Sequence, residues 1–267
     1  MSSLKPVTLI TGASAGIGEA FAHVFADHGH KLVLVARRVR ELELVAGAIE
    51  AAGRPRPLVI AIDLTQKQAT DSLARDILSH GLEPSIVVNN AGFGLRGLAA
   101  ELDPGQQLEI IDLNARVLTD LSLRWIDSMQ RHNGGLINIS SVASFFPGPG
   151  MAVYYASKAY VLAFTEALHK ELSPRGIKVT VVCPGPVATK FHARAGIAEA
   201  RLPRLLVRSA QRVAREGYQA FMRGQRIVVI GTANKILAFI PRLLSRQLML
   251  DLANNFQLRI NPDRLRR

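Results

Sequence analysis

Tyr154 and Lys158 are the residues whose types and spacing most directly suggest chemistry. They stand four residues apart in a predicted helix over 153–172, so they share one of its faces, one turn apart. Free tyrosine has a pKa of about 10 and is a poor acid or base near neutral pH. An ammonium about 4 Å away, at an effective dielectric of about 20, favours the tyrosinate by about 4 kcal/mol. We therefore expect the Tyr154 pKa to fall by about three units, toward about 7, so that the phenol can exchange a proton with a carbonyl or an alcohol.

This spacing also arises by chance in many amphipathic helices, so its meaning depends on the upstream sequence. A predicted strand at 7–10 is followed by Thr11-Gly12-Ala13-Ser14-Ala15-Gly16-Ile17-Gly18 and then by a predicted helix from Glu19 to about His28. Glycines let the backbone turn tightly and approach a pyrophosphate that rests on the helix N-terminus. The pattern predicts a dinucleotide-binding loop; a glycine-rich turn without a ligand is the alternative.

Predicted strands and helices alternate along the rest of the chain. The other strands are predicted at 31–36, 58–62, 84–88, 135–139, 177–182 and 226–230, and the other helices at 39–52, 104–129, 153–172 and 210–222, the last capped by Ser209. This alternation predicts an α/β fold in a single domain over 1–267, a Rossmann-type doubly wound parallel sheet of about seven strands with helices on both faces. Ligands of such sheets bind beyond the carboxyl ends of the strands, where this sequence carries small or polar residues.

Two arginines, Arg37 and Arg38, directly follow the second predicted strand. In a protein that uses a cofactor without a 2′-phosphate, this position usually holds an acid that hydrogen-bonds the ribose hydroxyl. Planar guanidinium groups suit a phosphate, so the sequence favours NADP(H) over NAD(H). The alternative is that the arginines only begin the solvated helix at 39–52.

Composition narrows the class of protein further. The single cysteine, Cys183, permits no internal disulfide, and the seven histidines lack metal-ligand spacing, so no metal site is predicted. Residues 1–6 do not resemble a secretory signal, and no run of about 18 apolar residues is present, which favours a cytoplasmic protein. The net charge of +12 is concentrated in residues 191–267, which hold 15 Lys+Arg against 4 Asp+Glu. That asymmetry points to an anionic partner for the C-terminal quarter.

Together these residues resemble the short-chain dehydrogenase/reductase family, in its compact single-domain, NADP-preferring branch. The matching motifs are, in order, Thr11-Gly12-x-x-x-Gly16-x-Gly18, Asp63, Asn89-Asn90-Ala91-Gly92, Asn114, Ser141, Tyr154-x-x-x-Lys158, and Pro184-Gly185 with Thr189. They cover residues 7 to about 190, and the last predicted strand extends the match to about 231. Each motif is common alone, whereas all of them in this order and spacing are highly specific.

The resemblance implies a catalytic set of Asn114, Ser141, Tyr154 and Lys158. Tyr154 would donate and accept the proton, and Lys158 would lower its pKa and bind the nicotinamide ribose. Ser141 would hydrogen-bond the substrate carbonyl; it is preferred to Ser140 because the family places its serine thirteen residues before the tyrosine. Asn114 would hold a water that links Lys158 to a proton relay, with a purely structural amide as the alternative.

The resemblance also implies which residues contact the cofactor. Asp63 would contact the adenine, Asn90 the adenosine ribose side, and residues 184–189 the nicotinamide amide. The full predicted set is Gly12, Ser14, Gly16, Ile17, Gly18, Arg37, Arg38, Asp63, Leu64, Asn90, Ala91, Gly92, Tyr154, Lys158, Pro184, Gly185, Val187 and Thr189. Relatives that prefer NADP often carry a basic residue where this sequence has Ala15, so the NADP(H) prediction depends on the two arginines alone.

The implied activity is that of an NAD(P)-dependent oxidoreductase acting on CH–OH groups, which moves hydride between nicotinamide and a carbonyl or secondary alcohol. A non-catalytic NADP-binding sensor is one alternative, although such proteins commonly lose the Tyr-Lys pair. An epimerase or dehydratase of the longer-chain branch would carry a Gly-x-x-Gly-x-x-Gly loop and a larger substrate domain, and this sequence has neither. We expect a homo-oligomer, dimer or tetramer, joined through the helices at 104–129 and 153–172, and no nucleic-acid partner.

Two C-terminal regions are distinguished within the domain: the substrate-loop region at 190–225 and the basic extension at 232–267. The resemblance implies that the segment after Thr189 closes over the substrate and varies with it. In the first, apolar residues edged by arginines predict a hydrophobic small-molecule substrate: Phe191, Ile197, Leu202, Leu205, Leu206 and Val207, with Arg194, Arg201 and Arg204. In the second, residues 235–252 are strongly apolar, Lys235, Arg242 and Arg246 fall near one helical stripe, and Pro241 is expected to divide two helices. A lid or subunit contact is the preferred interpretation; peripheral contact with an anionic membrane and recognition of an anionic substrate are the alternatives.

Overall fold

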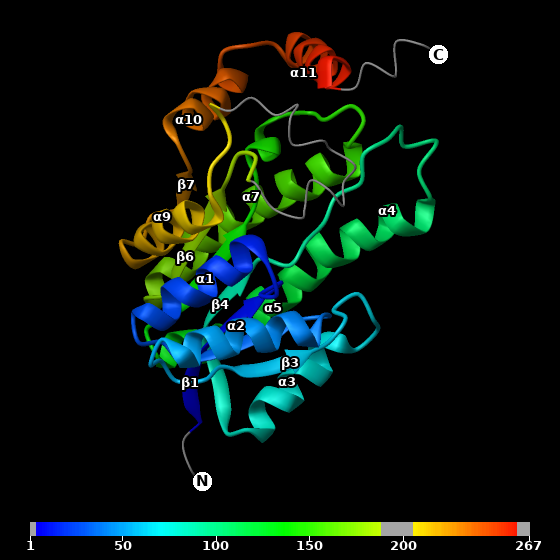
Figure 1. Ribbon diagram of the computed structural model, residues 1–267. Helices are drawn as coiled ribbons and strands as arrows, with labels where there is room; N and C mark the ends of the chain where they lie inside the picture. The colour runs from blue at the N-terminus through cyan, green and yellow to red at the C-terminus, as the bar shows by residue number, and fades with distance from the viewer. Residues whose placement is uncertain (1–3, 188–204, 261–267) are drawn as a thin grey trace.

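The structure, a computed structural model, describes residues 4–187 and 205–260 (Figure 1). Within these ranges, seven strands form one parallel sheet in the order β3-β2-β1-β4-β5-β6-β7. The strands are β1 Lys5–Thr11, β2 Leu32–Ala36, β3 Leu58–Ala61, β4 Leu82–Asn89, β5 Gly135–Ile139, β6 Lys178–Cys183 and β7 Ile227–Val229. The strand order reverses direction between β1 and β4, which places a ligand crevice beyond their carboxyl ends.

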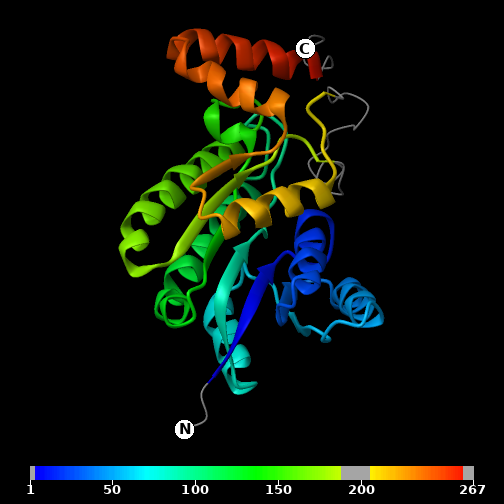
Figure 2. The ribbon, with the colours of Figure 1, turned by 90° about the vertical axis from the view of Figure 1, so that its left-hand side faces the viewer.

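Helices cover both faces of this sheet, as Figures 1 and 2 show. Those before β5 are α1 Gly16–Asp27, α2 Val39–Ala51, α3 Ala69–Ser79, α4 Pro104–Ile111, α5 Leu118–Arg124 and α6 Ile126–Arg131. Those after it are α7 Ala152–Leu172, α9 Ala210–Met222, α10 Thr232–Phe239 and α11 Arg246–Ile260. The predicted Rossmann-type fold, with its parallel sheet between two helical layers, is therefore confirmed.

The strands build two cores because successive side chains point to opposite faces of the sheet. Ile10 and Leu34 pack among residues of α1, α2 and α9, whereas their neighbours Leu9 and Val33 pack with α3, α5, α6 and α7. All four side chains are fully buried. Strands buried on both faces are therefore mostly apolar in sequence.

The prediction of one continuous helix over 104–129 is wrong, because the segment is divided into several helices. A π-helical turn, Asp112–Val117, separates α4 from α5, and Trp125 breaks the chain again before α6. At Trp125 the backbone turns to φ −110° and ψ 14°, outside the helical range, while its ring is buried in the core. Periodicity did not reveal these breaks because the apolar pattern continues across them. Helix α3 had not been singled out; it begins after Gln68, whose φ of 60° is left-handed.

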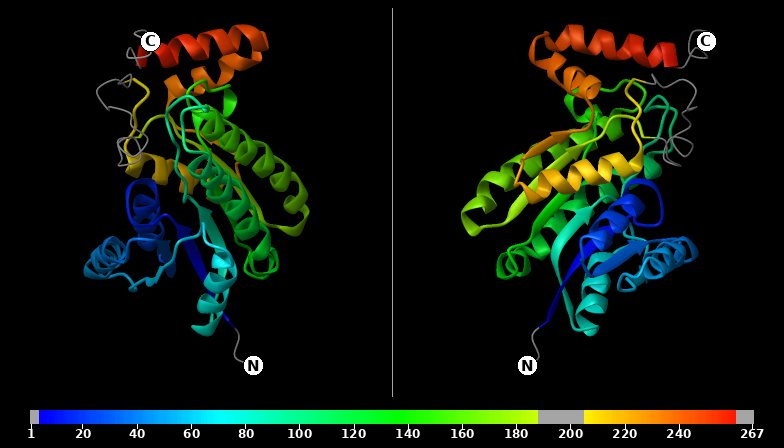
Figure 3. Two further views of the ribbon diagram at one scale, coloured as in Figure 1. Left: turned by 90° about the vertical axis from the view of Figure 1, so that its right-hand side faces the viewer. Right: turned by 60° about the vertical axis from the view of Figure 1, so that its left-hand side comes forward.

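The C-terminal helices lie at the end of the molecule where the strands finish, opposite the N-terminus (Figures 1 and 3). Pro241 lies in a short 3-10 turn, Ile240–Arg242, between α10 and α11, so the prediction that it divides two helices is confirmed. Ser209 also caps α9 as expected, since its hydroxyl accepts a hydrogen bond from the Arg212 amide at 3.2 Å. Among the described residues, no helix has both the length and the apolar character needed to cross a membrane.

Candidate active site

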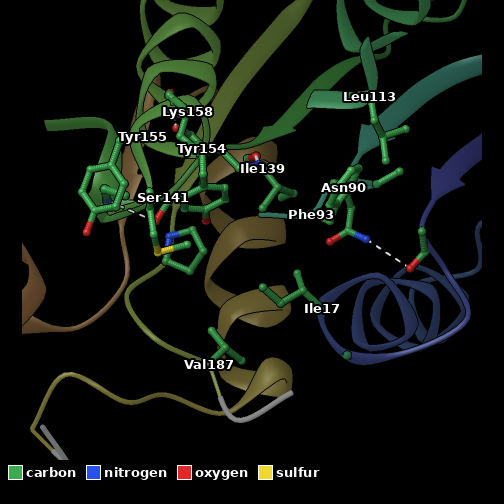
Figure 4. A pocket seen from close by; sticks show the side chains of 18 of the residues that line it. Ile17, Asn90, Phe93, Leu113, Ile139, Ser141, Tyr154, Tyr155, Lys158 and Val187 are labelled. Atoms are coloured by element: carbon green, nitrogen blue, oxygen red, sulfur yellow. Dashed lines mark hydrogen bonds between the residues drawn. The ribbon is translucent and has the colours of Figure 1, made fainter. Parts of the chain in front are cut away.

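A cavity of about 750 Å³ lies at the carboxyl ends of the strands (Figure 4). Its wall is built from the β1–α1 turn, the ends of β2 to β6, the start of α7 and parts of α10 and α11. A volume of this size is typical of sites that enclose small molecules and cofactors.

The β1–α1 turn forms one side of the cavity. Gly12 and Gly16 have φ values of 65° and 63°, which side chains other than hydrogen rarely allow. Asn90 braces this turn from the end of β4, because its amide nitrogen donates to the carbonyls of Thr11 at 2.9 Å and Gly12 at 3.2 Å. Figure 4 shows the Asn90 side chain directed toward the turn. The loop is thus held open with its backbone facing the cavity.

Gly18 lies beneath this turn and is not part of the cavity wall. A Cβ on Gly18 would come within 2.3 Å of the Gly12 carbonyl oxygen and 2.5 Å of the Asn90 amide nitrogen. Only glycine permits this close packing of α1 against the loop. Gly18, predicted to contact the cofactor, therefore supports the loop from beneath and does not face the cavity.

Charged side chains line the cavity beyond β2. The Arg37 guanidinium lies 3.6 Å from the Asp63 carboxylate, and that of Arg38 donates to the Ser14 hydroxyl at 3.0 Å. Burial raises the pKa of Asp63, but hydrogen bonds from Thr65 and the charge of Arg37 outweigh it and hold the pKa below its usual range. Asp63 is therefore an anion beside Arg37, and the Arg38 guanidinium lies equally close, 3.6 Å, to the Glu41 carboxylate.

Ser141 and Tyr154 meet on the opposite side of the cavity (Figure 4). Ser141 follows β5 and Tyr154 lies in the first turn of α7, and their hydroxyl groups form a hydrogen bond. Ser140 also lines the cavity, but its hydroxyl donates to the Lys158 backbone carbonyl at 2.8 Å and ties β5 to α7. Of the two adjacent serines, Ser141 is thus the one beside the tyrosine.

The expected fall in the Tyr154 pKa does not occur in this structure. Burial raises the pKa of Tyr154 to about 12, against a smaller lowering by the Ser141 hydrogen bond. The sequence estimate assumed an ammonium about 4 Å from the phenol oxygen in a polar medium. Instead the Lys158 ammonium lies 5.9 Å from the centre of the Tyr154 ring, and loss of hydration dominates. Tyr154 is consequently a neutral proton donor near pH 7.

Lys158 is itself buried, with 6% of its surface exposed. Its ammonium donates to the Ile139 carbonyl at 2.8 Å, and burial lowers its pKa to about 8. A Cβ on Gly92 would lie 3.5 Å from this ammonium, so the cation reaches the cavity wall beside the end of β4. Lys158 therefore changes charge just above neutral pH, inside the cavity.

Asn114 lies in the π-helical turn and is fully buried. Its side chain accepts from the Phe93 amide at 3.1 Å and donates to the Phe93 carbonyl and the Ser157 hydroxyl, each at 3.0 Å. These bonds pin the loop after β4 to α7. The π-turn directs Asn114 at that loop, as such turns often do near functional sites. Asn114 does not line the cavity itself.

The cavity gathers nearly all the predicted cofactor residues. Every one that the structure describes is part of its wall, apart from Gly18. Thr189 lies outside the described residues, as do the predicted pocket residues Phe191, Arg194, Ile197, Arg201, Leu202 and Arg204. Among the described residues, no group of three or more His, Cys, Asp and Glu side chains could hold a metal ion.

The apolar part of the wall differs from the prediction. Leu206 lines the cavity, but Val207 does not and Leu205 is 72% exposed, because the turn that holds Leu205 faces outward. Most of this wall comes from residues that sequence reasoning had not assigned to it: Phe93, Phe146, Met151, Tyr155, Leu237, Ile240, Met249 and Leu252. The apolar pattern of 235–252 was the sequence signal that could have assigned Leu237, Ile240, Met249 and Leu252 to the wall. Residues of α10 and α11 line the cavity, and whether this region acts as a lid, a subunit contact or a membrane contact stays a prediction.

The fold and the site together define a Rossmann-type, nucleotide-binding oxidoreductase. A family model described as short chain dehydrogenase matches residues 6–200. The chain is also 35% identical over 186 residues to an uncharacterized oxidoreductase of Staphylococcus epidermidis, covering 69% of this chain and 79% of that protein. The protein belongs to the short-chain dehydrogenase/reductase family.

Solved structures give the same assignment. A short-chain dehydrogenase from Sphingobium yanoikuyae in complex with NADPH has a TM-score of 0.78 and 30% identity, with 89% of this chain and 93% of that chain covered. A bulky-bulky ketone specific alcohol dehydrogenase from Comamonas testosteroni has a TM-score of 0.72 and 28% identity, with 96% and 93% covered.

Proposed function

We propose that the protein is an NADP(H)-dependent reductase of carbonyl compounds with apolar substituents. The observation that carries this proposal is the hydrogen-bonded pair of Tyr154 and Ser141 at one side of a cavity whose other side is the β1–α1 glycine loop. A carbonyl oxygen between the two hydroxyl groups would receive two hydrogen bonds as negative charge develops on it. When bound, the nicotinamide would supply the hydride.

The roles of the catalytic set follow from their chemistry. Tyr154, neutral up to a pKa of about 12, donates the proton to the carbonyl oxygen, and Ser141 orients that oxygen. Lys158 places a cation near the developing charge below its pKa of about 8. Asn114 holds the loop after β4 and, in this proposal, also positions a water that returns a proton toward Lys158.

The residues present fit a dinucleotide with a 2′-phosphate. Gly12 and Gly16 line the cavity with positive φ values, and α1 and α2 both begin at the cavity without a side-chain cap on their first amides. Arg38 is the N-cap residue of α2, so its guanidinium and the free amides of the helix would act together on a phosphate. The NADPH complex of the Sphingobium relative supports this choice of cofactor.

An apolar substrate is favoured by the wall opposite the glycine loop. Met151, Tyr155 and Leu206 line the cavity together with Leu237 and Met249 from the C-terminal helices. The Comamonas neighbour is a bulky-bulky ketone specific alcohol dehydrogenase, and the likeness supports a substrate with two sizeable substituents here.

Exposed apolar residues on α4, α5 and α7 would form the contact of a dimer or tetramer: Leu108, Ile111, Leu123 and Tyr160. A cytoplasmic location stays a prediction, and contact of α10 and α11 with a membrane surface is a second candidate role.

The decisive experiment measures NADPH and NADH oxidation against ketones graded by chain length and substituent size. We expect NADPH to be preferred and long-chain or bulky ketones to be reduced faster than short polar ones. The matched variant is Arg37→Ala/Arg38→Ala, in which the preference should shrink by about tenfold or more, since one charge-assisted hydrogen bond contributes about 1.5–3 kcal/mol. Equal use of both cofactors by the wild type would contradict the NADP(H) assignment. Faster turnover of short polar ketones would contradict the apolar substrate.

A pH profile tests the role of Lys158. Because kcat/KM for NADPH reports ionisations of the free protein, we expect a plateau at low pH and a fall through about pH 8, where Lys158 loses its charge. Lys158 is charged below its pKa. Because burial lowers that pKa to about 8, the charge is lost at a lower pH than in an exposed lysine. Lys158→Met has no such proton and should give a low, flat profile. A wild-type profile that stays level through about pH 10 would show that the Lys158 charge has no part in the reaction.

A further inference from the structure

The segment 232–260, comprising α10, the 3-10 turn and α11, presents apolar side chains on two different faces; we call it the cap. Its inner face closes the cavity with Leu237, Ile240 and Met249. Met249 is only 4% exposed, which shows that this face packs closely on the structure beneath. The inner face alone would account for a lid over an apolar substrate.

The outer face of the cap is also apolar, and it is open to solvent. Ile236 and Phe239, three residues apart in α10, are 62% and 52% exposed, and Leu243, directly after the 3-10 turn, is 71% exposed. None of the three lines the cavity. A contiguous exposed apolar cluster of this kind marks an interaction surface.

Basic side chains border this outer face. Lys235, Arg242 and Arg246 are all exposed, and none forms an ion pair within residues 4–187 and 205–260. The Arg242 guanidinium lies 5.8 Å from the centre of the Phe239 ring, so a cation and an apolar side chain are adjacent on this face. Within residues 231–255 the sequence holds three Lys and Arg residues against one acid, Asp251. The outer face is therefore cationic as well as apolar.

Exposed apolar side chains bordered by cations indicate which kind of partner fits this face. A second copy of the cap would bring two sets of unpaired cations together, which opposes self-association of this face. An anionic lipid surface offers both an apolar layer for these apolar side chains and negative charge for the cations at their border. The cap lies at the end of the molecule where the strands finish, opposite the N-terminal end of β1 (Figures 2 and 3).

We propose that the outer face of the cap docks on an anionic membrane surface, and that an apolar carbonyl substrate passes from the lipid, around the cap, into the cavity beneath its inner face. The docking follows from the cap alone, whereas the route for the substrate rests on the proposed reductase function.

Docking is tested by flotation of the full chain with vesicles of phosphatidylcholine, with and without about one third phosphatidylserine. We expect the protein to float with the anionic vesicles only. The charge variant Lys235→Gln/Arg242→Gln/Arg246→Gln should bind them more weakly by a factor on the order of 100, because each basic residue near such a surface contributes about fivefold. The apolar variant Ile236→Ser/Phe239→Ser/Leu243→Ser should lose binding by about tenfold or more.

Matched controls alter residues of the same type elsewhere on the surface. Lys170→Gln/Arg215→Gln/Arg223→Gln removes three exposed cations, and Leu44→Ser/Leu78→Ser/Met222→Ser removes three exposed apolar side chains, all away from the cap. Both controls should float as the wild type does. Docking is overturned if the wild type floats with neither vesicle, or if the cap variants float as well as the controls. It is also overturned if they change only the oligomer size, which would make this face a subunit contact.

Activity separates docking from the proposed function. A long-chain ketone carried in anionic vesicles should be reduced at least several-fold more slowly by the cap variants than by the wild type, while a water-soluble ketone is reduced equally by both. Equal rates on the vesicle-borne ketone would overturn the substrate route. Flotation needs no cofactor. If the protein floats with anionic vesicles but none of the ketones supports NADPH oxidation, the docking proposal stands and the proposed reductase function is wrong.

Discussion

Replacing Tyr154 by phenylalanine is expected to lower kcat for ketone reduction by a factor of about 10²–10⁴, the usual contribution of a positioned proton donor. The change removes the hydroxyl that is hydrogen-bonded to Ser141 and leaves the ring in place. Since the glycine loop and the arginines are untouched, NADPH should bind as it does to the wild type. The measurement is single-turnover reduction together with a fluorescence titration of NADPH.

Tyr160→Phe is the control for this variant. Tyr160 is on the same helix, α7, but it is 42% exposed and its hydroxyl bonds Thr119 at 2.7 Å, outside the cavity. We expect its rate to equal that of the wild type. If Tyr154→Phe retained full turnover, the proton would have to come from another group, and the proposed mechanism would be wrong.

Gly18→Ala is expected to weaken NADPH binding by about 5- to 150-fold, although Gly18 does not face the cavity. The added Cβ would come within 2.3 Å of the Gly12 carbonyl oxygen, so the loop or α1 must move. Overpacking of this kind costs about 1–3 kcal/mol, which is the affinity range given. The same displacement should lower the melting temperature. Both quantities are measured by NADPH titration and thermal unfolding.

Gly47→Ala gives the matched control in another helix. A Cβ at Gly47, in the middle of α2, would meet nothing within 4 Å. Alanine is favoured over glycine in a helix by up to about 1 kcal/mol, so this variant should be slightly more stable and bind NADPH normally. A Gly18→Ala protein that bound NADPH as tightly as Gly47→Ala would show that the loop tolerates displacement.

The sequence by itself determined the sheet, the glycine loop and the set of residues that meets in the cavity. Strand β2 was readable because a strand buried on both faces must be apolar throughout, and Arg37 and Arg38 were readable because they follow it directly. Parallel strands all end at one edge, so polar residues after β3, β4 and β5 had to converge there. For Asp63, Asn90 and Ser141, position in the chain was sufficient.

Tertiary structure alone decided the electrostatics and the roof of the cavity. Spacing places Tyr154 and Lys158 on one helix face, but hydration of each group depends on packing from other elements, so the pKa of Tyr154 rises to about 12 where the pair alone predicted a fall. The breaks around Asn114 and at Trp125 were hidden because the apolar pattern of the sequence continues across them. Which side of 235–252 covers the cavity depends on how α10 and α11 fold back across the strand ends. An apolar pattern on two faces does not encode that choice.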